Sequence, residues 1–160
     1  MSKAFTSEET EDAVILGRVV VRAAPGEERP ITARGHRALV ARRDGWIAER
    51  AAETAGSDRA RELEHRIALA TATLEAVRVV PSPAEPVVVG FGVCVTIRWE
   101  DGRVQRVVIV GPDEAEGERI SSGSPLARAL EGRRVGDAVE IERPRGAMEA
   151  EVLAIGPERA

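Results

Sequence analysis

Residues 63–77 carry apolar side chains at the spacing of a helix that packs along a partner helix. Successive members lie four, three, four and three residues apart, in the set Leu63, Ile67, Ala70, Leu74 and Val77. This is the spacing of a coiled-coil seam, which buries one stripe of a helix against its neighbour. We therefore predict that these residues form core rather than a ligand-binding site.

The partner helix is predicted just upstream. Thr32 is a suitable N-cap for the segment ARGHRALVARRDGWIAERAAET, Gly56 can end that helix, and Ser57 or Asp58 can cap the next one. The first helix has an apolar stripe interrupted by arginines, made of Leu39, Val40, Trp46, Ile47 and Ala51. Helices joined by so few residues run antiparallel, so we expect a hairpin with about 20 residues and roughly 30 Å in each arm.

A second unit is predicted after the segment VVPSPAEP. Its three prolines between Pro81 and Pro86 fix the backbone and indicate a stiff linker. Beyond it, β-rich runs flank Asp101-Gly102, and alternating runs flank Arg145-Gly146. Each pair of runs predicts a β-hairpin.

One short helix is predicted between these two hairpins. Ser124 is its cap, Pro125 its first residue and Gly132 the residue just past its end. A small antiparallel sheet with one helix packed on it is an α+β fold. We therefore divide the chain into a tail (1–30), a helical hairpin (31–80), a linker (81–86) and a sheet domain (87–160). The tail is acidic at its start and has one weak candidate strand or docking segment at Val14–Val21.

Composition excludes several classes of function. The net charge of -4 argues against a stand-alone DNA-binding protein, and we expect no independent sequence-specific DNA binding. The absence of Tyr and the 2% aromatic content argue against stacking of single-stranded nucleic acid. The single cysteine, Cys94, is expected to be a small buried residue in a reducing compartment. No signal peptide or membrane span is apparent, so a cytoplasmic protein is expected.

Catalytic and metal sites are also not expected. His36 and His65 lack the ligand spacing of a metal site. Ser57, His65 and Asp58 cannot form a hydrolase triad, because a solvent-facing helical turn provides neither pocket nor oxyanion hole. The few aromatic residues cannot line the pocket of a prolyl isomerase. We therefore predict a protein without enzymatic activity, metal or cofactor.

Three stretches identify a family resemblance. The segments IVGPDEAE, ISSGSPLARALEGRRVGDAVEI and EAEVLAI resemble the carboxy-terminal domain of the Gre (GreA/GreB) family of bacterial transcript-cleavage and elongation factors. The start MSKAFT and the segment PITARGHRAL resemble the GreB branch. The resemblance covers most of the chain and is strongest in its carboxy-terminal part.

The resemblance implies a two-part factor that acts on RNA polymerase. A carboxy-terminal domain with the FK506-binding-protein (FKBP-like) fold docks on a coiled coil at the rim of the polymerase secondary channel. The helical hairpin enters that channel toward the catalytic magnesium ion. In cleavage factors, two carboxylates in a Gly-Asp-Leu-x-Glu-Asn-Ala-Glu-Tyr type of run at the hairpin tip can hold a second magnesium ion and orient the attacking water.

This chain departs from the family pattern at the tip. It contains neither Asn nor Tyr, and the hairpin is shorter than the family norm by about ten residues per arm, or about 15 Å of reach. The acids near the turn are Glu53, Asp58 and Glu62, which are weak candidates for this role because helix capping and a solvated helix face explain them more simply. We predict a channel-binding regulator of elongation with weak or no stimulation of transcript cleavage. The alternatives are an active cleavage factor that uses these acids, and a regulator of nucleoside diphosphate kinase of the Rnk type, which also has a shortened hairpin.

Two sets of contact residues follow from this prediction. The polymerase-docking candidates are Asp113, Glu114, Ser124, Pro125 and Leu126. Alternatively, Asp113 is part of a turn formed by Gly111-Pro112-Asp113, and Leu126 belongs to the core. Hairpin arginines could touch nascent RNA or the channel walls, or be ordinary solvated surface, with Arg37, Arg43 and Arg59 as candidates.

Overall fold

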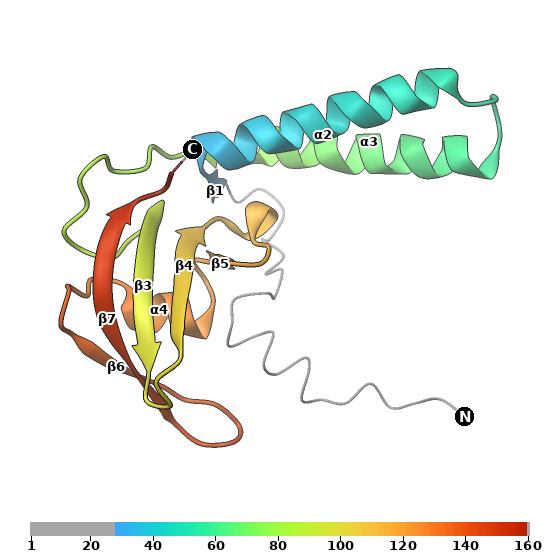
Figure 1. The fold of residues 1–160 in the computed structure, drawn as a ribbon. Coiled ribbons are helices and arrows are strands. Elements are labelled where there is room, and N and C mark those ends of the chain that lie inside the picture. The colour runs from blue at the N-terminus through green and yellow to red at the C-terminus, as the bar shows by residue number, and fades with distance from the viewer. Residues whose placement is uncertain (1–27, 160) are drawn as a thin grey trace, which may run out of the picture.

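A computed structural model describes residues 28–159 of the chain. The candidate strand at Val14–Val21 and most of the predicted tail lie outside the described residues. The described part combines helices and strands in one α+β arrangement, in which two long helices project from one end of a curved sheet (Figure 1).

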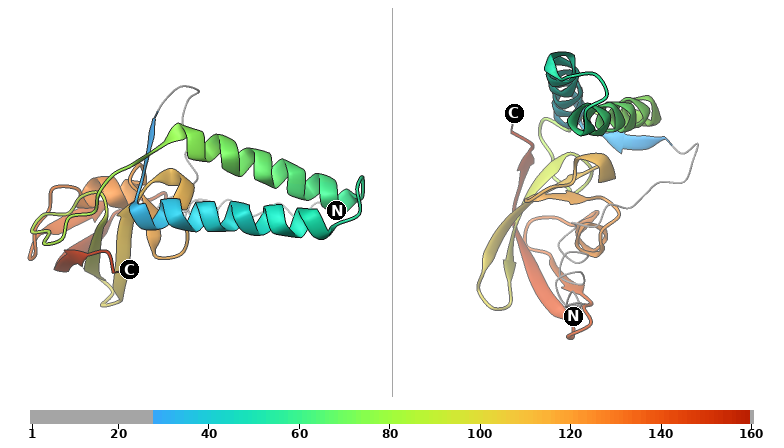
Figure 2. Two further views of the ribbon diagram at one scale, coloured as in Figure 1. Left: turned by 90° about the horizontal axis from the view of Figure 1, so that it is seen from above. Right: turned by 90° about the vertical axis from the view of Figure 1, so that its right-hand side faces the viewer.

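Helices α2 (Ala33–Ala52) and α3 (Asp58–Ala76) lie side by side and antiparallel (Figures 1 and 2). The predicted caps are confirmed, since the Thr32 hydroxyl accepts from the Gly35 amide and the Ser57 hydroxyl from the Ala60 amide. On α3, Ala60, Leu63 and Ala70 are buried.

The apolar stripe of α2 is less buried than the sequence suggests. Gly35 is the one buried residue of this helix, and Ile47 is 47% exposed. The ring of Trp46 is half-buried and lies 5.7 Å from the Arg66 guanidinium carbon. Among residues 28–159 no third layer packs on this helix pair, so only a narrow seam is covered and the flanks of the stripe stay exposed.

Two short strands join the roots of the helices. Strand β1 (Arg29–Ile31) pairs in parallel with β2 (Val77–Val79). Neither strand is predicted from the sequence, which places Arg29 and Pro30 in the tail and Val77 in the helical seam. Val77 instead caps α3 and begins β2, because a β-branched run followed by proline favours extended backbone.

The sheet has the strand order β5-β4-β3-β7-β6. The two predicted hairpins are present, formed by β3 (Val93–Trp99) with β4 (Val104–Val110) and by β6 (Ala138–Ile141) with β7 (Met148–Pro157). The prediction of a wholly antiparallel sheet is wrong, because β5 (Arg119–Ser121) runs parallel to β4. The connection between them contains a short 3-10 helix, η1 (Pro112–Glu114), and this crossover reverses the direction of the chain before β5.

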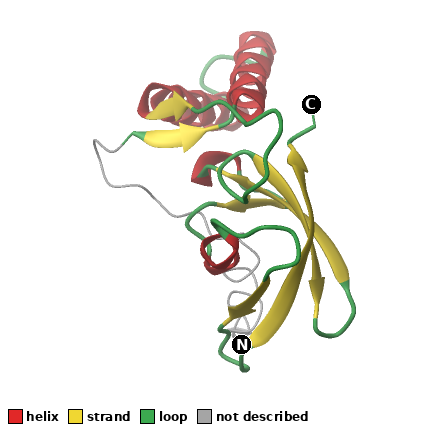
Figure 3. Cartoon of the chain, turned by 90° about the vertical axis from the view of Figure 1, so that its left-hand side faces the viewer, coloured by secondary structure: helices red, strands yellow, loops and turns green. Residues whose placement is uncertain are grey.

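The main core lies between one face of the sheet and α4 (Pro125–Leu130), and Figure 3 shows a short helix beside the sheet. As predicted, the Ser124 hydroxyl caps helix α4 and Gly132 lies just past its end. The backbone of Gly132 is left-handed. The other face has a small apolar cluster that includes Cys94, which is buried as expected, and Arg106 Nε donates to its Sγ at 2.8 Å. Within residues 28–159, no helix has the length and apolar character needed to cross a membrane.

Candidate functional site

The three predicted tip acids lie where the sequence places them, around the turn that joins α2 to α3. Glu53 is the C-cap of α2, and Asp58 is the first residue of α3 and fully exposed. Asp58 lies 3.3 Å from Arg61 Nη1, and Glu62 accepts from Arg59 Nη1 at 2.9 Å. The structure thus brings two of the three acids close to arginines of their own helix.

The carboxylate of Glu62 lies between the guanidinium groups of Arg59 and Arg66. The hydrogen bond from Arg59 and the charge of Arg66 lower the pKa of the Glu62 carboxyl group. The carboxylate is therefore ionised at neutral pH, but its oxygens are occupied by guanidinium groups rather than free for a cation. In the described part of the chain, no three His, Cys, Asp or Glu side chains gather as a set that could hold a metal ion.

The three arginines predicted to contact RNA differ in their surroundings. Arg43 is paired with Asp44 at 2.9 Å, and Arg59 Nε donates to Glu49 at 2.9 Å. Arg37 is exposed and has no ion-pair partner among residues 28–159. Arg37 is therefore the one of the three whose charge is fully available to a ligand.

The predicted docking residues of the sheet unit are more buried than expected. Leu126 is fully buried in the core, as the alternative interpretation had it, because α4 turns this residue and Leu130 toward the sheet. Ser124 is also buried, and its hydroxyl accepts from the Ala127 amide at 3.2 Å. Pro125 is half-buried. Pro125 is therefore more exposed than its neighbours Ser124 and Leu126.

Asp113 and Glu114 face the helix pair rather than open solvent. Asp113 Oδ2 lies 2.7 Å from Arg29 Nε, which links η1 to β1. The Glu114 side chain is only 4% exposed. Both carboxylates therefore make contacts inside the molecule, which the sequence alone does not reveal.

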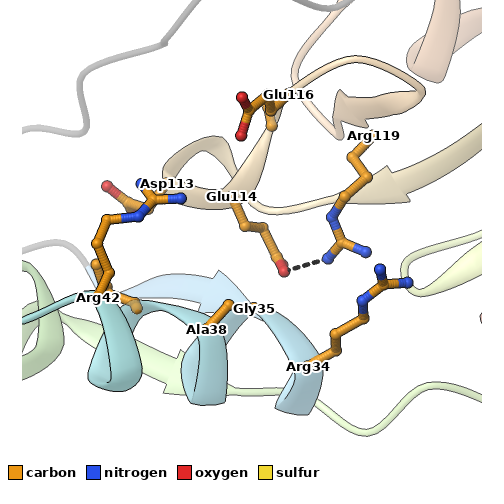
Figure 4. Close-up of a pocket in the computed structure, with 10 residues that line it drawn as sticks. Arg34, Gly35, Ala38, Arg42, Asp113, Glu114, Glu116 and Arg119 are labelled. Carbon is orange, nitrogen blue, oxygen red and sulfur yellow. Dashed lines mark hydrogen bonds and ion pairs between the residues drawn. The ribbon is translucent and has the colours of Figure 1, made fainter. Parts of the chain in front are cut away.

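Glu114 accepts hydrogen bonds from four donors. Its Oε1 accepts from the backbone amides of Thr32 at 2.7 Å and Gly111 at 3.1 Å. Its Oε2 accepts from the Thr32 hydroxyl at 2.6 Å and from Arg119 Nη2 at 2.6 Å. One carboxylate thus connects the first turn of α2 with η1 and β5, as the close-up in Figure 4 shows for Arg119.

Two glycines make this approach possible. A Cβ atom on Gly35, in the first turn of α2, would lie 1.7 Å from Glu114 Oε2. A Cβ atom on Gly111 would lie 1.8 Å from the carbonyl oxygen of Pro30. In the Thr-x-x-Gly start of α2, Thr32 therefore caps the helix, and the missing side chain of Gly35 leaves room for the Glu114 carboxylate.

Arg119 extends these contacts to the end of β7. Its Nη1 pairs with the carboxylate of Glu158, which is also 3.7 Å from Arg34 Nη1. Arg34 Nη1 in turn donates to the carbonyl oxygen of Arg159 at 3.0 Å. We call the residues Thr32, Gly35, Glu114, Arg119 and Glu158 the base cluster.

A cavity of about 400 Å³ lies beside the base cluster, between α2 and η1 (Figure 4). Arg34 and Arg42 line it from α2, and Asp113, Glu114 and Glu116 line it from the other side. Because most of these charges already have partners of opposite sign, the arrangement is suited to holding two elements together rather than to proton transfer or nucleophilic chemistry.

Sequence reasoning misses Arg119 and Glu158 entirely. Neither stands in a motif with chemical meaning, and the two are 39 residues apart. The available signals are indirect, namely the glycine in a helical first turn and the carboxylates after Gly111-Pro112. These signals indicate a close approach but not the partner that makes it.

Comparison with known proteins identifies the family. A family model described as the transcription elongation factor GreA/GreB carboxy-terminal domain matches residues 84–157. The chain is 34% identical over 123 residues to the transcription elongation factor GreB of Yersinia pestis, covering 75% of this chain and 71% of that protein. It is 36% identical over 124 residues to GreA of Geobacillus kaustophilus, covering 74% and 78%. This chain belongs to the GreA/GreB family.

Other relatives of this Gre-family chain match over a smaller share of their length. The chain is 42% identical over 94 residues to GreB of Pseudomonas aeruginosa, and the match spans 57% of the chain and 56% of that protein. Among solved structures, a GreA/GreB factor from Nitrosomonas europaea matches at a TM-score of 0.40 and 23% identity, covering 81% of this chain and 99% of that one. Membership in the Gre family therefore rests on the sequence relationship.

Proposed function

We propose that this Gre-family chain binds bacterial RNA polymerase at its secondary channel and regulates elongation. The observation that carries the proposal is the pair of antiparallel helices projecting from a sheet unit that matches the Gre carboxy-terminal domain. In this proposal the FKBP-like sheet domain (87–160) docks on the polymerase and the helical hairpin (31–80) enters the channel. Such action would place the protein in the cytoplasm.

We further propose that the chain stimulates transcript cleavage weakly or not at all. Helix α2 has 20 residues and is about 30 Å long. The acids at its far end are Glu53, Asp58 and Glu62, and arginines stand beside two of them. The chain itself is proposed to have no catalytic activity, because any cleavage would take place at the metal site of the polymerase.

A backtracked elongation complex tests this proposal. The chain is added to the stalled complex, and transcript shortening is followed with time. We expect shortening at the rate of polymerase alone, while the chain competes with an active GreB for the complex. Stimulated cleavage that is abolished by the double substitution Glu53→Gln and Asp58→Asn would establish the alternative, an active cleavage factor.

Docking is tested by binding to core RNA polymerase. Pro125→Ala and Asp113→Ala are the test variants, and Glu131→Ala is the matched control, since this exposed carboxylate follows α4 directly. We expect weaker binding for the two test variants and parental affinity for the control. Parental affinity for all three variants would remove this docking surface.

The second candidate is a regulator of nucleoside diphosphate kinase of the Rnk type, which the short helices favour. Capture of purified RNA polymerase and of purified nucleoside diphosphate kinase on the immobilised chain distinguishes the two. Within the polymerase complex, Arg37 is our first candidate for contact with nascent RNA, and crosslinking from position 37 to the transcript would test it.

A further inference from the structure

We propose that Glu114 is a positioning residue, which sets the direction in which the helix pair points away from the sheet unit. Glu114 belongs to η1 in the sheet unit, and three of its contacts are with the first turn of α2, namely two hydrogen bonds from Thr32 and the close approach to Gly35. That this direction guides the helix pair into a channel of RNA polymerase rests on the proposed function. The direction itself is a property of the free protein.

The chemistry at this position is specific for a carboxylate. Four donors point at its two oxygens, and one of them is the guanidinium group of Arg119. The negative charge also lies at the N-terminus of α2, where the helix dipole favours it. Glutamine has the same shape, but an NH2 group replaces one of the two oxygens. The two protein donors that point at that oxygen would then meet another donor and lose their hydrogen bonds.

The burial of the cluster makes these contacts restrictive. Glu114 and Glu158 have side chains 4% and 5% exposed, and Thr32 is fully buried. A buried hydrogen-bonded charge is costly to leave without its partners, so alternative directions of α2 that break these contacts are disfavoured. Exposed ion pairs such as those along the helix pair impose little restriction of this kind.

The length of the helix pair amplifies any change at its base. Helix α2 is about 30 Å long, so a rotation of about 10° at Thr32 moves the far end by about 5 Å. A displacement of about 5 Å exceeds the separation of contacting side-chain atoms, which is about 4 Å, so it changes how the tip fits into a narrow passage in a partner. A single buried carboxylate can therefore decide whether the tip enters such a passage.

Distance measurements between spin labels test the proposal without RNA polymerase. Cysteines replace Ala55 in the turn and Val104 on β4, two exposed positions, in a chain that also carries Cys94→Ala. A second labelled pair, Val104→Cys with Val135→Cys, lies within the sheet unit and reports on its own fold. Double electron–electron resonance then gives the distance distribution of each pair.

The variants are chosen in matched pairs. Glu114→Gln removes the charge and is compared with Glu116→Gln, an exposed carboxylate two residues away without an ion-pair partner in the described part of the chain. Thr32→Val removes the hydroxyl group and is compared with Thr32→Ser, which keeps it. For Glu114→Gln and Thr32→Val, we expect the distance from position 55 to 104 to shift or broaden by about 5 Å or more.

The controls and the pair within the sheet unit decide the outcome. We expect Glu116→Gln and Thr32→Ser to keep the parental distribution, and the distance from position 104 to 135 to stay unchanged in every variant. An unchanged distance from position 55 to 104 in Glu114→Gln would overturn the proposal. A change of both distances would also overturn it, because Glu114 would then hold the fold rather than the direction. Failure to bind polymerase would contradict the proposed function but would not alter these distances.

Discussion

Gly35 occupies a position where a methyl group has no room, since the added carbon would lie 1.7 Å from Glu114 Oε2. We expect Gly35→Ala to lower the free energy of unfolding by about 1–3 kcal/mol, because the carboxylate must leave its four donors or the helix must shift. Chemical denaturation followed by circular dichroism measures this change.

Gly45 provides the matched control within the same helix. Apart from its chain neighbours and the backbone of its own helix, no heavy atom of the described residues lies within 4 Å of a Cβ added at this position. Gly45→Ala should therefore stabilise the protein by about 0.5–1 kcal/mol, because alanine loses less backbone entropy in a helix. Equal effects of the two substitutions would show that the Glu114 contact does not depend on the glycine.

At the scale of single residues, capping could be predicted and the base cluster could not. Thr32, Ser57 and Ser124 each accept from the amide three residues on, which is a local relation readable from the sequence. The contact between Thr32 and Glu114 spans 82 residues and depends on how two elements meet in space. The sequence therefore indicates Glu114 as a surface acid, although the structure makes it a buried one.

At the scale of elements, the stability of the helix pair depends on the few residues that are buried in the seam between α2 and α3. Leu63 is fully buried and Leu69, on the same helix, is 56% exposed. We expect Leu63→Ala to cost about 2–5 kcal/mol in the free energy of unfolding and Leu69→Ala less than about 1 kcal/mol. Urea unfolding of the two variants measures the difference, and similar losses would contradict the assignment of the seam.

The ion pairs of α3 predict a small dependence of stability on pH. The pKa of Glu62 lies below its ordinary value because of the hydrogen bond from Arg59 and the charge of Arg66. A lowered folded-state pKa stabilises the fold above the unfolded-state value, which is about 4.3, and the contribution is lost as pH falls through the folded-state value. The effect is small because all three side chains are exposed.

Thermal unfolding of Glu62→Gln from pH 7 to pH 3 measures this contribution. We expect the melting temperature of the parent to exceed that of the variant at pH 7 and the difference to vanish toward pH 3. Glu75→Gln is the control, because this exposed carboxylate of α3 has no ion-pair partner within residues 28–159. A difference for Glu62→Gln that persists at pH 3 would show that the pair contributes through packing instead.

The elements that could be predicted are those with local signals. Asp101-Gly102 and Arg145-Gly146 join consecutive strands, so turn chemistry is sufficient to predict their hairpins. Strands β1, β2 and β5 have three residues each and pair in parallel with strands that are not joined to them by a tight turn. Such short parallel pairings depend on tertiary contacts, and no periodicity marks them in the sequence.

For the whole molecule, reach is the property that separates the proposed regulator from a cleavage factor. We expect activity to appear in a chain with about ten more residues in each arm, or about 15 Å more length, and with the acidic family turn at its tip. The measurement is transcript shortening in a backtracked complex. The same extension with alanines in place of the acids is the control, and inactivity of both chains despite polymerase binding would contradict the argument from length.

The parallel pairing of β1 with β2 has a consequence for how the protein can be divided. This pairing joins the chain just before α2 to the chain just after α3. The Val80 amide also donates to the carbonyl oxygen of the buried Ile31 at 2.8 Å. A break in the loop around Gly56 would leave each fragment with one strand of that ladder. The two fragments should therefore reassociate into a working whole, which makes this chain a natural scaffold for split-protein complementation.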